Sequence, residues 1–162
     1  MNAHEVKTKV LHYWRFTRNK YNFIATEVGK FNSDILVSNE KEIIECEIKI
    51  SKEDLIKDFK KKKHSIYKKP TPWYSKWIPN RFYFAVPTSL IEFTLNFVEN
   101  TDYGVIEVFD KKISNKKKEV YCRIIKSARV IQPQFKEKLH KQIYMRSSSE
   151  LIRLRIRYLV KN

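Results

Sequence analysis

One short segment restricts the fold of this chain more than any other. Residues 42–51, EIIECEIKIS, alternate apolar and charged side chains. Successive side chains of a β-strand point to opposite faces of a sheet, so the pattern predicts a strand with one apolar and one charged face. The apolar face, which we expect to lie in the core, carries Ile44, Cys46, Ile48 and Ile50. The charged face carries Glu45, Glu47 and Lys49, and this gathering of charge needs an explanation.

Before this strand, the sequence predicts a helix and two further strands. Residues 3–18 repeat apolar side chains near the 3.6-residue helical period, at Val6, Val10, Leu11, Trp14 and Phe16 or Thr17. The β-rich runs 21–28 and 33–39 flank Gly29 and Asn32, and polar residues around Glu40 separate the second run from residues 42–51. We therefore expect an opening helix followed by a three-strand meander.

After Ser51, a plausible N-cap, residues 52–63 place Leu55, Ile56 and Phe59 at helical spacing. Residues 60–80 contain three prolines and many lysines, which predicts a basic, aromatic loop. A strand over 81–87, a helix over 89–98 and a hairpin of 103–110 with 119–131 around a Lys-rich turn, 111–118, should follow.

The C-terminal segment predicts a last helix over residues 150–160, capped by Ser148 or Ser149. Its apolar residues are expected to pack, and its arginines to stay in solvent: Leu151, Leu154, Ile156 and Leu159 against Arg153, Arg155 and Arg157. Without an internal repeat or linker, we expect a single domain over residues 1–162 of the α/β class, in the order α-β-β-β-α-β-α-β-β-α.

Charge points to the class of partner. The 34 Lys and Arg against 18 Asp and Glu give a net charge of +16, which favours a polyanion, first of all nucleic acid. An anionic membrane surface is the weaker alternative, and a compositional bias toward Lys, Ile and Asn would explain the charge without any partner.

The cysteines and the hydropathy pattern suggest a cytoplasmic protein. Cys46 and Cys122 lie in apolar runs and have no His or Cys at metal-ligand spacing, so we interpret them as reduced core residues. The sequence predicts neither a signal peptide nor a membrane span, because it has no apolar N-terminal run and no apolar stretch of membrane-spanning length.

The short turn before residue 42 predicts the strand register. If Glu40 and Lys41, or the four residues 39–42, close the turn, Asp34 lies directly opposite Glu47. Two neighbouring carboxylates repel unless a cation offsets their charge, and Mg²⁺ binds such oxygen ligands. Lys49, on the same face, could orient or help deprotonate a water and offset charge on a phosphate. The alternative is a cross-strand charge pair on a solvated face.

These motifs resemble the PD-(D/E)XK nuclease superfamily, with Asp34 at the strand-two acid and Glu47-Ile48-Lys49 at the E-x-K. The segments EVGKFNSDILVSN, EIKISKEDLIKDFKKKKH and RFYFAVP with YGVIEV are similar to its MmcB-like branch, over about residues 21–110. Ser33 stands where the family has a proline before the acid.

The resemblance implies a restriction-endonuclease-like α/β fold, a central mixed sheet flanked by helices, that binds Mg²⁺ or Mn²⁺. Asp34, Glu47 and the main-chain carbonyl of Ile48 would hold the metal, and Lys49 would attend the water. Glu27 matches a further family acid and is either a catalytic residue or a sheet-edge charge. Glu45 is a less favoured metal ligand.

Nucleic-acid contacts are expected after the third strand. In the helix, Lys60, Lys63 and His64 are favoured for phosphate contact, with a solvated helix face as the alternative. Capping and surface pairing explain Ser51, Asp54 and Asp58. The basic loop combines aromatic and cationic side chains suited to base stacking and phosphate neutralisation, unless the aromatics cover the core edge: Tyr67, Trp73, Tyr74 and Trp77 with Lys61, Lys62, Lys68, Lys69 and Lys76.

The resulting hypothesis is a metal-dependent deoxyribonuclease of low sequence specificity, acting in DNA repair, recombination or phage DNA processing. Two alternatives stay open: a DNA-binding recruitment module of the same fold that does not cleave, and a nuclease directed at RNA.

Overall fold

The fold is built on a six-stranded sheet in which strand order follows chain order, β1 to β6. The computed structural model describes the backbone of residues 1–114 and 117–161, and the side chains of 1–110 and 121–158. The strands are β1 Phe23–Val28, β2 Ser33–Ser38, β3 Ile43–Ile48, β4 Arg81–Pro87, β5 Gly104–Ser114 and β6 Lys117–Lys126. Strands β3, β4 and β5 run parallel, and the other neighbours are antiparallel, which confirms a mixed sheet.

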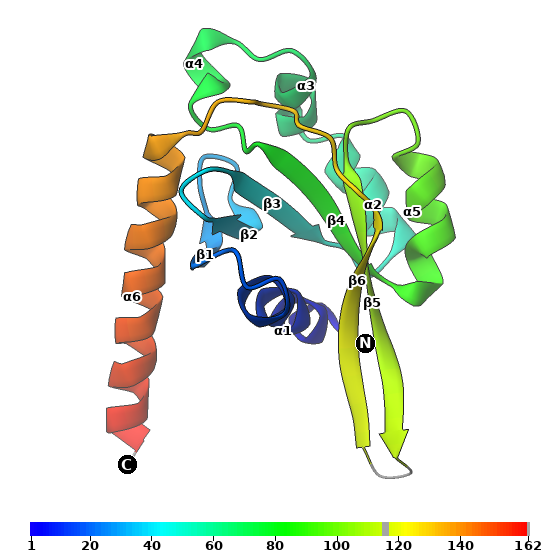
Figure 1. The fold of residues 1–162 in the computed structure, drawn as a ribbon, viewed down its shortest axis with the longest axis vertical. Coiled ribbons are helices and arrows are strands. Elements are labelled where there is room, and N and C mark those ends of the chain that lie inside the picture. The colour runs from blue at the N-terminus through cyan, green and yellow to red at the C-terminus, as the bar shows by residue number, and fades with distance from the viewer. Residues whose placement is uncertain (115–116, 162) are drawn as a thin grey trace.

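Helices cover both faces of this sheet, so the α/β class is confirmed. The helices are α1 Ala3–His12, continued by the π-helix η1 Tyr13–Thr17; α2 Lys52–Phe59; α3 Lys62–Lys68; α4 Pro72–Ser75; the 3₁₀ turn η2 Thr88–Leu90; α5 Ile91–Phe97; and α6 Glu137–Lys161. Figure 1 shows α6 beside β1 at one edge of the sheet and the β5–β6 hairpin at the other, both extending past α1.

Strand β3 is buried on both faces, because two separate clusters cover it. On one face Ile44, Cys46 and Ile48 pack with Val6, Val10 and Trp14 of the first helix. On the other face a second cluster joins α2, α3 and α5 to strands β4 and β5 through side chains such as Leu55, Ile66 and Phe82. Ile50, expected on the core face, is instead 41% exposed, since β3 has already ended at Ile48.

The predicted meander and its register are confirmed. Ile35 pairs with Cys46 and Leu36 with Glu45, the alignment that sets Asp34 opposite Glu47. The turn is closed at Asn39, whose backbone N–H donates to the carbonyl of Glu42 at 3.3 Å.

The expected loop over residues 60–80 is wrong, because it contains α3 and α4. Pro72 is the first residue of α4, where the missing N–H of proline costs no hydrogen bond. The β5–β6 hairpin is confirmed. Its strands reach Ser114 and begin again at Lys117, so they take up most of the expected turn 111–118; residues 115–116 lie outside the described part of the chain.

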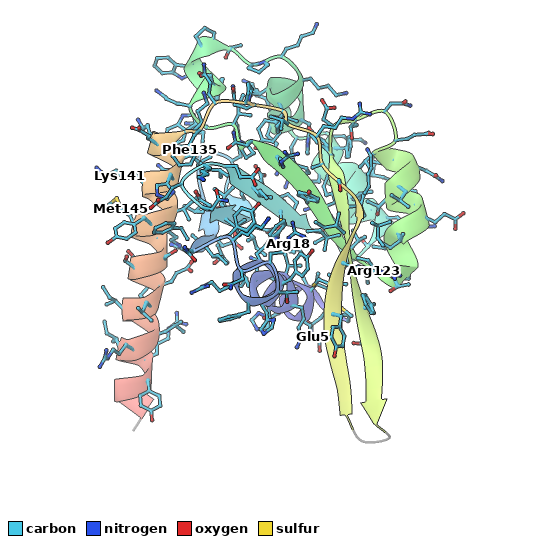
Figure 2. The ribbon with its side chains drawn as sticks, in the orientation of Figure 1. Glu5, Arg18, Arg123, Phe135, Lys141 and Met145 are labelled. Atoms are coloured by element: carbon cyan, nitrogen blue, oxygen red, sulfur yellow. The ribbon has the colours of Figure 1, made fainter. Side chains whose placement is uncertain are left out.

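The C-terminal helix begins at Glu137, well before the expected cap. Ser148 and Ser149 lie inside α6, and their hydroxyls donate to the carbonyls of Tyr144 and Met145. Near the start of α6, Leu139 and Ile143 lie four residues apart on one face of the helix. They belong to a third apolar cluster, which also contains Ala25, Val28, Leu36 and Ile43. Figure 2 shows Lys141 and Met145 on the side of α6 that faces away from the sheet.

The second half of α6 does not pack as expected. Leu151, Leu154 and Ile156 are 68%, 61% and 55% exposed, because α6 continues past the edge of the sheet. Leu159 lies outside the described side chains. Arg153, Arg155 and Arg157 are exposed, as predicted. In the described part of the chain, no helix has the length and apolarity needed to cross a bilayer.

The two halves of α6 should differ sharply in their effect on stability. Leu139→Ala removes a side chain that is 1% exposed, so we expect the free energy of unfolding to fall by about 2–5 kcal/mol. Leu151→Ala, the matched control on the same helix, should change it by less than about 0.5 kcal/mol. Urea unfolding of both variants measures the difference. Equal losses would show that the distal half of α6 is also packed in solution.

Candidate active site

The predicted acidic pair meets at the end of β3. The backbone N–H of Asp34 donates to Oε1 of Glu47 at 3.4 Å. In return, the backbone N–H of Ile48 donates to Oδ2 of Asp34 at 2.8 Å. The strand register therefore brings both carboxylates to one place, as the sequence predicted.

Lys49 joins these two acids. Its Nζ lies 3.2 Å from Oε2 of Glu47 and 3.9 Å from Oδ2 of Asp34. A third carboxylate, Asp58 of α2, approaches more closely still, with Oδ2 at 2.9 Å from the same Nζ. Burial lowers the pKa of the Lys49 ammonium, but the three carboxylates outweigh it and raise the pKa above its ordinary value. These carboxylates therefore favour the ammonium form of Lys49, which donates hydrogen bonds.

A cleft of about 430 Å³ opens onto this site. Its lining includes Asp34, Ile48 and Lys49 together with Lys7 and Asp54, and it is completed by Ala3 and His4. The Asp34 side chain is 26% exposed, whereas that of Glu47 is 3% exposed. A ligand entering the cleft would thus reach Asp34 first and find Glu47 behind it.

Asp34 is the carboxyl group whose ionisation is most affected at the cleft. Burial, followed by the negative charge of Glu47, raises its pKa from 3.8 to about 6. The hydrogen bond from Ile48 and the ammonium groups of Lys49 and Lys7 act in the opposite direction without overcoming this rise.

Lys63 bridges Glu45 and Glu47 from inside the protein. Its Nζ lies 2.9 Å from Oε1 of Glu45 and 2.7 Å from Oε1 of Glu47. The hydroxyl of Tyr67 donates to the other oxygen of Glu45 at 2.5 Å. The pKa of Lys63 is raised, because these carboxylates outweigh its burial.

The expectation that Lys63 and His64 contact phosphate is therefore corrected. They are 2% and 3% exposed, because α3 turns their side of the helix, shared with Ile66 and Tyr67, toward the sheet. Lys60, Lys68 and Lys69, expected at the same surface, are exposed. Asp58 was expected to form surface pairs but is 1% exposed.

Glu27 reaches the site through another residue. It forms an ion pair with Lys7, whose Nζ also lies 3.9 Å from Oδ1 of Asp34. Its backbone has φ of +50°, an uncommon value for a residue with a side chain. Glu27 is 42% exposed and meets the cleft only through Lys7, which lines it.

The end of the basic, aromatic segment lies at the start of β3, away from the cleft, where the backbone N–H of Asn80 donates to the carbonyl of Ile43 at 2.8 Å. Arg81, just after this segment, pairs with Ile44 near the start of β3, whereas Lys49 follows its end. Trp73 is 74% exposed, with Lys76 5.1 Å from its ring centre. Tyr74 and Trp77 are half-buried, and Tyr74 stacks on Phe31. Trp73 is therefore the aromatic side chain of this segment that is most open to a partner.

The cleft offers oxygen ligands of the type that a divalent cation takes. Among the described residues there is no group of three or more His, Cys, Asp or Glu side chains placed to hold a metal. Four carboxylates lie at the site, those of Asp34, Glu45, Glu47 and Asp58, and four ammonium groups lie near them: Lys49 and Lys63 are buried, whereas Lys7 and Lys61 are more exposed. Mg²⁺ often takes one or two protein carboxylates with waters and phosphate, which Asp34 and the Ile48 carbonyl fit best. Both oxygens of Glu47 already meet lysines.

Comparisons with known proteins bear on the fold alone. No protein-family model matches the sequence, and no curated protein matches it. One similar solved structure is a protein of unknown function from Silicibacter pomeroyi, with a TM-score of 0.64 and 14% identity, covering 96% of this chain and 92% of that one. This chain therefore shares its fold with that bacterial protein.

The raised pKa of Asp34 predicts a pH-dependent stability. Its folded pKa, about 6, exceeds the unfolded value of 3.8, so ionisation of Asp34 costs more in the folded state. The stability that protonated Asp34 contributes is present below about pH 4 and is lost as pH rises through 6, by up to about 3 kcal/mol. We expect the free energy of unfolding of wild type, measured with urea, to fall over this range relative to that of Asp34→Asn. A difference between the two proteins that stays constant from pH 4 to 7 would contradict the raised pKa.

Proposed function

We propose that this chain is a metal-dependent nuclease that hydrolyses phosphodiester bonds at the cleft beside Asp34. The observation that carries the proposal is the meeting of Asp34, Glu47 and Lys49 at the end of β3, with Lys49 Nζ 3.9 and 3.2 Å from the two carboxylates. Asp34, Ile48 and Lys49 also line the cleft, where the Asp34 side chain is 26% exposed and that of Lys49 is 5% exposed, so a substrate would meet Asp34 directly.

Each residue has a distinct part in this proposal. Asp34 and the carbonyl of Ile48 would hold Mg²⁺ or Mn²⁺, with Glu47 adding negative charge from behind. The ion, when bound, would polarise the phosphate and lower the pKa of a water. Lys49 carries a positive charge, so its role is to orient the water and offset charge that develops on the phosphate oxygens. Lys7, paired with Glu27, adds a second positive charge at the rim.

DNA is the substrate that we propose, on charge and resemblance together. A net charge of +16 favours a polyanion, and exposed Lys60, Lys68, Lys69 and Trp73 provide phosphate and stacking contacts. The resemblance to MmcB-like proteins favours DNA over RNA and a setting in DNA repair, recombination or phage DNA processing.

Cleavage assays test the proposal directly. With Mg²⁺ or Mn²⁺ we expect cutting of single-stranded, duplex or branched DNA that EDTA abolishes. Asp34→Asn and Lys49→Ala should each lower the rate about 100-fold or more, because each removes a charge from the reacting centre. Lys41→Ala, which removes an exposed lysine beyond the other end of β3, is the matched control and should cut normally.

Two outcomes would point elsewhere. Tight DNA binding without cutting under any metal would favour the recruitment module and contradict the nuclease. Faster cutting of a matched RNA oligonucleotide would show that the substrate is RNA.

Trp73 should contribute to nucleic-acid binding without supporting the fold. We expect Trp73→Ala to weaken DNA binding by about 1–3 kcal/mol, the usual effect of losing one stacked base, and to leave the unfolding midpoint unchanged. Phe16→Ala, which removes an aromatic side chain that is 63% exposed after α1, serves as control. Fluorescence anisotropy with a labelled oligonucleotide measures both. Equal affinities for the two variants would exclude Trp73 from the interface.

A further inference from the structure

Asp58 is a buried carboxylate with several donors around it. Its Oδ2 lies 2.9 Å from Lys49 Nζ and 2.5 Å from Lys61 Nζ, and its Oδ1 lies 2.8 Å from Nε2 of His64. The side chain is 1% exposed. The Asp58 carboxylate therefore lies near three lysines: Lys49 and Lys63, which are buried, and Lys61, which is exposed. Asp58 is not among the residues that line the cleft.

Three carboxylates surround the Lys49 ammonium and together determine its position. Asp58 lies 2.9 Å away, Glu47 3.2 Å and Asp34 3.9 Å. Asp58 is the nearest of the three acids, and it acts together with Glu47, whose negative charge does most to raise the pKa of the ammonium. Lys49 therefore stays within ion-pair distance of Asp34 but outside hydrogen-bonding distance, so the carboxylate that faces the cleft has no hydrogen bond from it.

His64 and Tyr103 fix Asp58 in turn. Burial lowers the pKa of His64, so its ring is neutral near pH 7 and carries one N–H. Donation from Nε2 to Asp58 leaves Nδ1 as an acceptor, and the hydroxyl of Tyr103 lies 2.9 Å from Nδ1. The Asp58 carboxylate, which only accepts, selects the tautomer with its proton on Nε2, and the Tyr103 hydroxyl completes the arrangement by donating to Nδ1.

The chain connects these residues through one tight turn. The backbone N–H of Lys61 donates to the carbonyl of Asp58 at 2.8 Å, and that of His64 donates to the carbonyl of Lys61 at 3.2 Å. Phe59 stacks on the His64 ring, with ring centres 5.1 Å apart. The turn between α2 and α3 therefore holds Asp58 and His64 side by side.

We propose that Asp58, oriented by His64 and Tyr103, is a positioning residue that holds the Lys49 ammonium away from Asp34 and so keeps Asp34 free for a cation. This role rests on the proposed nuclease function, because it assigns the cation to Asp34. Without the charge of Asp58, Lys49 moves onto Asp34 and competes with the cation for the same carboxylate.

Asp58→Asn tests the proposal, since it removes the charge at nearly constant shape. We expect Mn²⁺ affinity, measured by calorimetry, to fall about tenfold or more, and kcat to fall with little change in KM for DNA. Glu53→Gln, which removes one negative charge from an exposed position on the same helix, is the matched control. Tyr103→Phe should give a smaller effect in the same direction.

A second readout does not depend on activity or metal. The ¹⁵N NMR signal of the Lys49 ammonium, assigned by its loss in Lys49→Arg, should be visible in wild type because its protons are held in hydrogen bonds. Asp58→Asn should shift this signal. It should also lower the Asp34 pKa, through the closer approach of Lys49.

The outcomes separate the two proposals. A shifted Lys49 signal and a lowered Asp34 pKa in Asp58→Asn support the positioning role even if wild type cuts no DNA, which would overturn the nuclease alone. An unchanged signal and unchanged Mn²⁺ affinity, in a folded Asp58→Asn protein, would overturn the positioning role whether or not wild type cuts DNA. A loss of kcat with an unchanged Lys49 signal would also overturn it.

Discussion

The burial of two glutamates in the middle of the sheet is the constraint on which the surrounding structure depends. Glu45 and Glu47 are 1% and 2% exposed, and an unpaired buried carboxylate costs several kcal/mol. Lys63 lies between them and satisfies an oxygen of each. This contact fixes which face of α3 meets the sheet, and α3 in turn sets the α2–α3 turn that brings Asp58 and His64 to Lys49.

The sequence was sufficient to predict the acidic pair, because local rules determine it. Alternation along residues 42–51 placed Glu45, Glu47 and Lys49 on one face, and a short turn set Asp34 opposite Glu47. What alternation could not show is that the charged face is also covered. A strand with charges on alternate positions usually faces water on that side, whereas here α2 and α3 close over it.

The partners of these acids were not predictable in the same way. Lys63 stands in a run of four lysines, 60–63, and composition alone does not distinguish the buried one from its exposed neighbours. The available signal was helical spacing: Lys63, Ile66 and Tyr67 lie at positions i, i+3 and i+4 and so share one face. Prolines at 70, 72 and 79 obscured it, since they favoured a loop. The start of α6 was missed for a similar reason, because Leu139 and Ile143 are a single i, i+4 pair in a polar stretch.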